Sequence, residues 1–152
     1  MSLKVFNNLI VWNPKDKESK KQYDDFFRSF IKRKARKTKY SDDAEYYDLL
    51  DFNIHVPEPK NLKEKLLIKW RMDNWGTSGN QDSNIIDREY QLEIMFDTIN
   101  STPFKWVEKI VELYPKLDLH YMWEIEGNEG YYYYSEDGKL KEGDYEDYKN
   151  DM

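Results

Sequence analysis

The chain has no cysteine among its 152 residues, which excludes disulfide bonds and metal sites built from thiolates. It has only two histidines, which form no His-x-x-x-His pair, and its six glycines form no phosphate-binding loop. We therefore expect no metal site and no cofactor. Asn7 and Asn8 interrupt the only early apolar run, which argues against a signal peptide, and no stretch approaches the ~20 apolar residues of a membrane span. We expect a soluble, cytoplasmic protein with no membrane partner.

Aromatic residues are abundant in this chain. The hydrophobic fraction is only 39%, but there are 13 Tyr, 7 Phe and 5 Trp, which bury a large area per residue. We expect one domain with an aromatic core. The net charge of −6 is unevenly spread, because residues 15–39 contain eleven basic and four acidic residues, whereas 124–152 contain ten acidic residues and three lysines. Such asymmetry is typical of solvated chain ends, which we favour, or of one end that contacts nucleic acid.

Hydrophobic periodicity and turn residues predict an alternation of strands and helices. The first half is expected to contain a strand at 3–12 with apolar residues on both faces, a helix with its apolar face from Tyr23 to Ile31 and a basic cluster in its last turns, an irregular segment at 40–50 and a strand at 52–56. A second helix is expected to begin with a capping box at Asn61 and Glu64 and to stop at Gly76, and a turn at 78–83 follows it. The remaining elements are a strand at 89–97, a helix from Thr102 and Pro103 to Pro115, and paired strands at 117–125 and 131–134.

This order predicts an α+β fold, a largely antiparallel sheet with helices packed on one face. The whole of 1–140 is expected to form a single domain, in which a strand–helix–strand portion, 1–60, wraps onto a core at about 61–140. Residues 141–152 are acidic and are expected to form a frayed tail.

Three short motifs resemble one known family. They are Trp70-Arg71 with Asn74-Trp75-Gly76-Thr77, Phe96-Asp97-Thr98, and Ser101-Thr102-Pro103 before a helix; the run from Leu50 to Pro59 is also similar. The sequence resembles the YubB-type family of phage and plasmid proteins over roughly residues 50–135. The resemblance implies a ferredoxin-like core and a mobile-element origin, but no established activity. The sequence departs from the family pattern after Thr77, where Ser78 and Gly79 replace a lysine and an aromatic residue.

The first candidate binding group is Arg71, Asn74, Trp75 and Thr77. An arginine and an amide beside indoles can hold an anion or stack a base. The same residues can instead end a helix and pack its aromatic side chains, and we favour this structural interpretation. A second candidate group lies on the expected hairpin. Tyr131 to Tyr134 must alternate between the two faces of a strand, so Tyr132 and Tyr134 can join Met122 in a surface for a partner or a dimer. A tyrosine-rich edge whose hydroxyls reach water is an equally favoured interpretation.

Two other chemistries stay open. Asp118, His120 and Glu124 fall on one face of an expected strand and could serve a small hydrolase, although a solvated sheet surface is the favoured interpretation. The basic cluster could bind a phosphate backbone through Arg28, Lys32, Arg33, Lys34, Arg36 and Lys37, within the helix end at 28–39. An acidic tail could also mimic nucleic acid.

The sequence-based hypothesis is therefore an accessory protein of a phage or mobile element that binds a protein, such as a host factor, without catalysis. Nucleic-acid binding through the basic cluster is the first alternative. The formation of a homodimer is left open. The sequence does not identify the partner.

Overall fold

The computed structural model describes residues 3–37, 44–79, 81–87, 90–126 and 130–150, and the side chains among them outside 28–37, 44–49, 81–84 and 86–87. The described elements are, in chain order, β1 (Lys4–Trp12), α1 (Lys17–Phe30), β2 (Ile31–Lys37), β3 (Ala44–Leu50), α2 (Glu64–Asn74), β4 (Gln81–Asp87), β5 (Gln91–Ile99), α3 (Phe104–Leu113), β6 (Leu119–Ile125), β7 (Gly130–Glu136), β8 (Lys139–Gly143) and α4 (Tyr145–Asn150).

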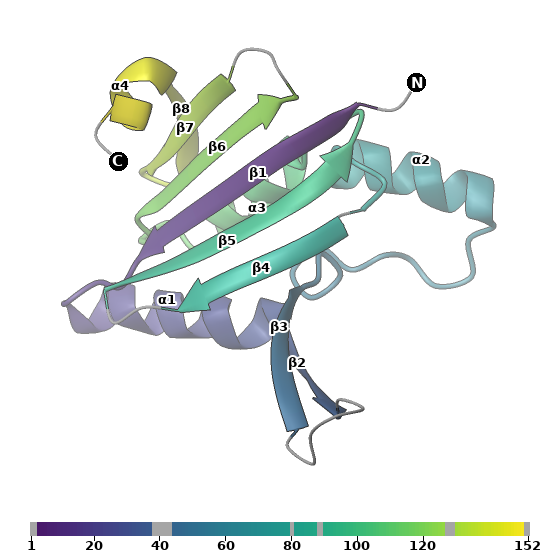
Figure 1. Ribbon diagram of the computed structural model, residues 1–152, viewed down its shortest axis with the longest axis horizontal. Coiled ribbons are helices and arrows are strands. Elements are labelled where there is room, and N and C mark those ends of the chain that lie inside the picture. Colours follow the sequence, from purple (N-terminus) through teal and green to yellow (C-terminus); the bar gives the residue numbers. More distant parts are fainter. Residues whose placement is uncertain (1–2, 38–43, 80, 88–89, 127–129, 151–152) are drawn as a thin grey trace.

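A six-stranded sheet in the order β4-β5-β1-β6-β7-β8 forms the body of the molecule. Every neighbouring pair in it is antiparallel. The helices α1, α2 and α3 lie behind this sheet, and α4 lies in front of it beside β7 and β8 (Figure 1). The predicted α+β architecture with an antiparallel sheet is therefore confirmed. One face of the sheet is covered by helices, and we call the other, which carries only α4, the open face.

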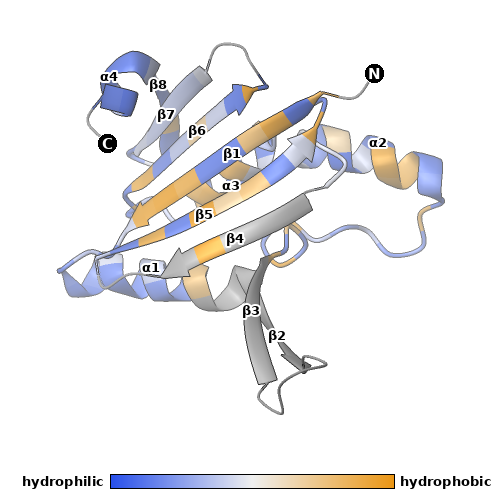
Figure 2. Cartoon of the chain, in the orientation of Figure 1, coloured by the Kyte–Doolittle hydropathy of each residue, from blue (hydrophilic) through white to orange (hydrophobic). Residues whose placement is uncertain are grey.

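The core forms where the helix-covered face meets α3. Strand alternation places Leu9 and Val11 of β1 beside inward residues of β5 and β6, and all of these side chains are buried. Figure 2 shows the apolar colour concentrated along β1 and β5, whereas α4 is polar. The inner residues of α3 close the core from behind: Trp106, Val107, Ile110 and Val111. Full burial of such a side chain stabilises the fold by about 1.5–3 kcal/mol.

A buried polar chain crosses this apolar core. Asn7, 3% exposed, accepts a hydrogen bond of 2.7 Å from the Tyr121 hydroxyl through its Oδ1. Its Nδ2 lies 3.1 Å from Thr98 Oγ1, which donates to the Ser101 carbonyl. The Ser101 hydroxyl in turn lies 3.0 Å from the buried Thr77 hydroxyl. Because a buried polar group is costly unless it is hydrogen-bonded, this chain fixes β1, β5 and β6 against the turn after α2.

The basic segment differs from its prediction. Helix α1 ends at Phe30, and residues 31–37 form β2, which pairs with β3 in a separate two-stranded sheet. The apolar periodicity that predicts the helix stops at Ile31 in the sequence, so a longer helix would have no further apolar face. The expected irregular segment at 40–50 contains β3 from Ala44 onward, and the other residues in it lie outside the described part of the chain.

The segment 52–56 is a turn and not the predicted strand. Two indole N–H groups hold it, because Trp106 Nε1 donates to the Phe52 carbonyl at 3.2 Å and Trp75 Nε1 to the Val56 carbonyl at 2.9 Å. These hydrogen bonds take the place of those that the two carbonyl groups would accept from a neighbouring strand. The capping box is also wrong: α2 has Lys63 as its N-cap without a side-chain hydrogen bond, and Asn61 adopts a φ of 72°.

The acidic C-terminal segment, as far as residue 150, differs from the predicted frayed tail. Residues 139–143 form β8, and Tyr145–Asn150 form α4. The sequence analysis looked for residues that could enter the core, whereas Tyr145 and Tyr148 pack on the opposite, open face. Strand β4 was missed in a similar way, because polar residues at 78–83 predicted a turn and β4 begins at Gln81.

Candidate functional site

The Asn74–Thr77 motif joins two parts of the helix layer. Gly76, with a φ of 86°, ends α2, and a Cβ there would lie 2.6 Å from the Thr102 carbonyl oxygen. Trp75 is 3% exposed, and its carbonyl accepts a hydrogen bond from the Trp106 amide at 3.2 Å. Only a glycine permits this approach between the end of α2 and the turn before α3. Trp75 and Gly76 therefore join α2 to the turn before α3, and the binding role of the motif stays a prediction.

Arg71 and Asn74 also make contacts within this part of the molecule. The Arg71 Nε lies 2.5 Å from Glu58 Oε2, and its guanidinium lies over the Trp75 ring at 5.6 Å. Asn74 Nδ2 donates to the Trp70 carbonyl at 2.9 Å. Arg71 and Trp75 line a cavity of about 210 Å³, but Glu58 lines it too. Because that carboxylate already pairs with the arginine, the cavity is unfavourable for an anion.

The second predicted group comes together on the open face. Met122 pairs with Tyr132, and His120 pairs with Tyr134, so Met122, Tyr132 and Tyr134 share one side of the sheet. Beside Met122 lies an apolar hollow of about 320 Å³, lined also by Phe6 and Met95. The Phe6 side chain is 39% exposed. The two predicted groups thus lie on opposite sides of the sheet and form two separate features.

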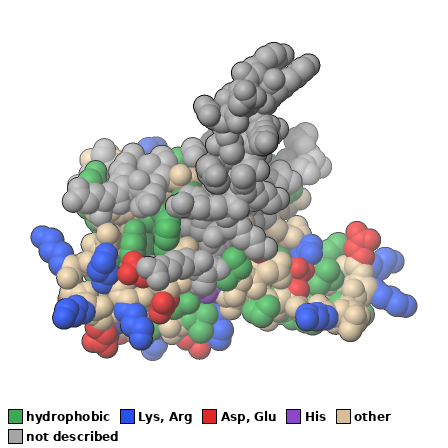
Figure 3. Space-filling view, turned by 90° about the horizontal axis from the view of Figure 1, so that it is seen from below, with side chains coloured by type: hydrophobic (Ala, Val, Ile, Leu, Met, Phe, Trp, Pro, Cys, Tyr) green, Lys and Arg blue, Asp and Glu red, His purple; other side chains and the backbone are tan. Residues whose placement is uncertain are grey.

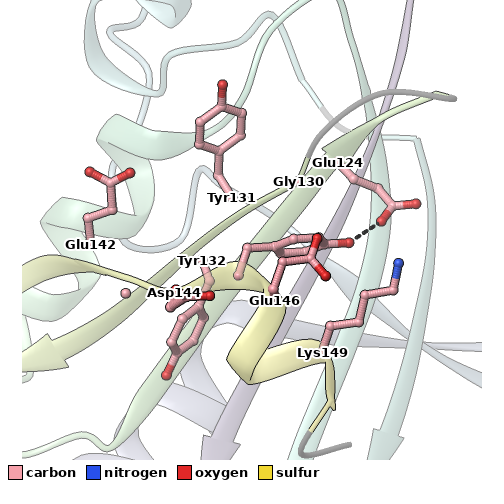
Figure 4. Close-up of a pocket in the computed structure, with 10 residues that line it drawn as sticks. Glu124, Gly130, Tyr131, Tyr132, Glu142, Asp144, Glu146 and Lys149 are labelled. Atoms are coloured by element: carbon pink, nitrogen blue, oxygen red, sulfur yellow. Dashed lines mark hydrogen bonds between the residues drawn. The ribbon is translucent and has the colours of Figure 1, made fainter.

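An acidic cavity of about 550 Å³ lies between β7, β8 and α4 (Figure 4). Its acidic lining residues are Glu124, Glu142, Asp144 and Glu146, and Lys149 is the basic one. In Figure 4, Glu124 and Lys149 lie on one side of the cavity and Glu142 on the other. Glu124 also lines the apolar hollow, so the two hollows adjoin. The combination offers apolar contact and negative charge side by side.

Glycines allow the tyrosines of this region to lie flat on the sheet. A Cβ at Gly130 would lie 2.2 Å from the Tyr145 ring, and one at Gly143 would lie 2.6 Å from the Tyr132 ring. The Tyr145 hydroxyl donates to Glu124 Oε2 at 2.5 Å. This hydrogen bond is the largest of the causes that raise the pKa of Tyr145 to about 12, and partial burial and the nearby carboxylates add to it.

A stack of rings holds α4 against the open face. The Tyr148 and Tyr132 ring centroids are 4.2 Å apart with planes inclined by 10°, and Tyr148 lies 6.2 Å from the His120 ring. Burial, together with the neighbouring Tyr132 hydroxyl and Glu93 carboxylate, raises the pKa of Tyr148 to about 12. Helix α4 therefore forms one wall of the acidic cavity and is fixed by aromatic contacts.

The three residues considered for catalysis do not converge on one reacting position. His120 Nε2 lies 2.9 Å from Asp118 Oδ1, and its Nδ1 lies 2.5 Å from the Tyr132 hydroxyl. Glu124 is bonded to Tyr145 instead, and neither Asp118 nor His120 lines the cavities beside it. In the described part of the chain, no three His, Asp or Glu side chains are placed to hold a metal ion. Asp118 and His120 thus position Tyr132, whereas Glu124 positions Tyr145.

The second histidine, His55, and the six basic residues of the nucleic-acid alternative have different settings. His55 is stacked on Phe26 at 5.6 Å, and its Nδ1 lies 3.3 Å from the Tyr114 hydroxyl; burial lowers its pKa. Arg28 lies in α1, and Lys32, Arg33, Lys34, Arg36 and Lys37 lie in β2, while the side chains of all six are outside the described set.

Sequence reasoning missed Phe6, Met95, Tyr145 and Tyr148 as parts of this surface. The signal for Phe6 was present, because apolar residues occur on both faces of the strand at 3–12 and only one face can meet the core. Tyr145 and Tyr148 are three residues apart in an acidic stretch, which would place them on one side of a helix.

Comparison with family models, with curated proteins and with solved structures gives no significant match for this chain. Among the residues that the structure describes, no helix combines the length and the apolar character needed to cross a membrane.

Proposed function

We propose that this chain is a non-catalytic binding module that captures a protein segment on the open face of its sheet. The segment would carry both apolar and basic side chains. The observation that supports this most is the adjacency of the apolar hollow and the acidic cavity, which share Glu124. An apolar side chain of the partner would enter between Phe6, Met95 and Met122.

The chemistry of the two hollows favours such a segment. Exposed apolar side chains that gather on one face are typical of interaction surfaces, and methionines adapt to differently shaped partners. The carboxylates beside them favour lysine or arginine, and they disfavour nucleic acid, whose phosphates they would repel. Charge complementarity of this kind raises the association rate, so binding should weaken as salt is added.

We also propose that the central part of the sheet has a ferredoxin-like arrangement. The strand order β4-β5-β1-β6, with α1 between β1 and β4 and α3 between β5 and β6, supports it. The hairpin β2–β3 and α2 would then be insertions between α1 and β4. An origin as an accessory protein of a phage or mobile element rests on the YubB-type resemblance alone.

Peptide selection tests the proposed function. A displayed library of random peptides is selected against the full-length protein, and the enriched peptides are then measured against the double variant Phe6→Ser, Met122→Ser. The proposal predicts enriched peptides that combine an apolar residue with lysine or arginine. Their affinity for the double variant should be at least ~10-fold weaker, which corresponds to about 1.4 kcal/mol.

A matched control uses two exposed apolar residues on helices of the covered face, Leu66 in α2 and Leu113 in α3. The double variant Leu66→Ser, Leu113→Ser removes a similar amount of apolar surface and should bind the selected peptides as the parent does. Failure to enrich any peptide would contradict the proposal. So would enriched peptides that bind the Phe6→Ser, Met122→Ser variant equally well, or that carry acidic residues in place of basic ones.

A further inference from the structure

The hairpin β2–β3 projects from the body of the molecule as a two-stranded ribbon (Figure 1). Its strands are in continuous antiparallel register from Ile31 opposite Leu50 to Lys37 opposite Ala44. It belongs to no larger sheet, and its base lies against α1 and β4. An isolated two-stranded hairpin is marginally stable in water, so a ribbon of this kind gains stability from a partner.

The sequence makes this ribbon strongly basic. Five of the seven residues of β2 are lysine or arginine, namely Lys32, Arg33, Lys34, Arg36 and Lys37. Strand β3 contributes only two acidic residues, Glu45 and Asp48. The whole chain has a net charge of −6, so the ribbon opposes the sign of the rest. On the face of the molecule seen in Figure 3, the described basic and acidic side chains are interspersed.

The pairing with β3 also brings aromatic residues to the basic strand. Tyr47 lies opposite Lys34, and Tyr46 lies opposite Ala35. At the end of a helix, where the sequence predicted it, the basic cluster would have no such neighbours. Arg33 and Arg36 lie opposite Asp48 and Glu45, whereas Lys32, Lys34 and Lys37 lie opposite uncharged residues, one of them a tyrosine. Cations beside aromatic residues are typical of nucleic-acid contacts.

The geometry points to duplex DNA as the partner of the ribbon, an activity beyond the proposed protein binding. Two paired strands lie about 4.8 Å apart, and the major groove of B-DNA, about 12 Å wide, admits a two-stranded ribbon. The major groove of duplex RNA is too narrow and deep for the same insertion. The acidic cavity is separated from the ribbon, because β3 contacts β4 at one edge of the sheet and the cavity lies at the β8 edge.

Fluorescence anisotropy with a labelled duplex of about 20 base pairs and mixed sequence tests the inference, using the full-length protein at several salt concentrations. The triple variant Lys32→Gln, Lys34→Gln, Lys37→Gln removes three charges from the ribbon. If all three contact phosphates, the slope of log K against log salt becomes shallower by about 2.7, and affinity near 100 mM salt falls at least ~10-fold. The matching RNA duplex should bind the parent protein more weakly than the DNA.

Two controls separate this inference from general electrostatics and from unfolding. The triple variant Lys60→Gln, Lys63→Gln, Lys65→Gln removes the same charge at exposed positions before and within α2, and it should bind as the parent does. The variant Lys32→Arg, Lys34→Arg, Lys37→Arg keeps the charge of the ribbon and should retain binding. Absence of DNA binding by the parent, or equal losses in the two glutamine variants, would overturn the inference. Peptide binding at the open face would survive either result.

Discussion

The two faces of β1 differ although they belong to one strand. Val5, Leu9 and Val11 point into the helix-covered face and are at most 2% exposed, whereas Phe6 and Trp12 on the open face are 39% and 41% exposed. Similar apolar side chains therefore serve the core at one position and the surface at the next. The helix-covered face forms the core, and the open face exposes Phe6 and Trp12, where we propose that a partner binds. The predictions below test this division.

The largest effect is expected at the helix-covered face. Trp106→Ala should lower the free energy of unfolding by about 3–5 kcal/mol, because it empties a fully buried site. It also removes the N–H that holds the Phe52 carbonyl. Urea unfolding measures the change. Phe6→Ala on the open face should cost less than about 1 kcal/mol, and equal losses in the two variants would contradict the division.

The adjacent asparagines of β1 provide a closer comparison. Asn7→Ala should destabilise the protein by about 1–3 kcal/mol, since it leaves the Tyr121 hydroxyl and the Thr98 hydroxyl without their buried partner. Asn8→Ala removes a partly buried hydrogen bond to Glu93 and should cost less. Thermal unfolding of both variants checks this order. A larger loss of stability for Asn8→Ala than for Asn7→Ala would contradict the prediction.

A third prediction concerns the attachment of α4 to the open face. Glu124→Gln removes the charged acceptor of the Tyr145 hydroxyl, so the Tyr145 pKa should fall from about 12 toward its ordinary value of 10.0. NMR of tyrosines labelled at the Cζ carbon follows this titration. Glu142→Gln changes the net charge equally without touching Tyr145 and should leave its pKa in place. A Tyr145 pKa unaffected by Glu124→Gln would show that this hydrogen bond does not hold the tyrosine.

The last prediction is a dependence of stability on alkaline pH. The pKa values of Tyr145 and Tyr148 are raised from 10.0 to about 12 in the folded protein. Their contribution is therefore complete below pH 10 and is lost as the pH rises through 12. Urea unfolding between these pH values should show a falling free energy of unfolding, and the double variant Tyr145→Phe, Tyr148→Phe should show a smaller fall. Identical pH profiles would contradict the proposed attachment.

The sequence predicted the elements that have a one-sided pattern. Alternation from residue 90 to 97 predicted β5, and the spacing of Val107, Ile110 and Val111 predicted the buried side of α3. The segment 52–56 alternates too, but two indoles distant in sequence hold it as a turn, and local periodicity contains no information about them. The basic strand β2 was wrongly predicted as part of a helix, because its partner strand β3 was not recognised in the sequence.

The candidate site was predicted in part. Met122, Tyr132 and Tyr134 lie together as the strand pattern indicated, but Phe6 and Met95 join them only through the pairing of β1 with β5 and β6. Tyr145 lies over Gly130, and Tyr148 stacks on Tyr132, whose ring lies over Gly143 across the β7–β8 pairing; a tail considered alone reveals none of these contacts.

The central claim, that the open face binds a partner, is tested most directly with methionine methyl labels. Met95 and Met122 line the apolar hollow, and Met72, 40% exposed on α2, is an internal control. The selected peptide is titrated into protein labelled with ¹³C at the methionine methyl groups. The account predicts that the Met95 and Met122 signals shift with saturation while the Met72 signal stays in place. A peptide that binds but shifts only Met72, or none of the three, would contradict it.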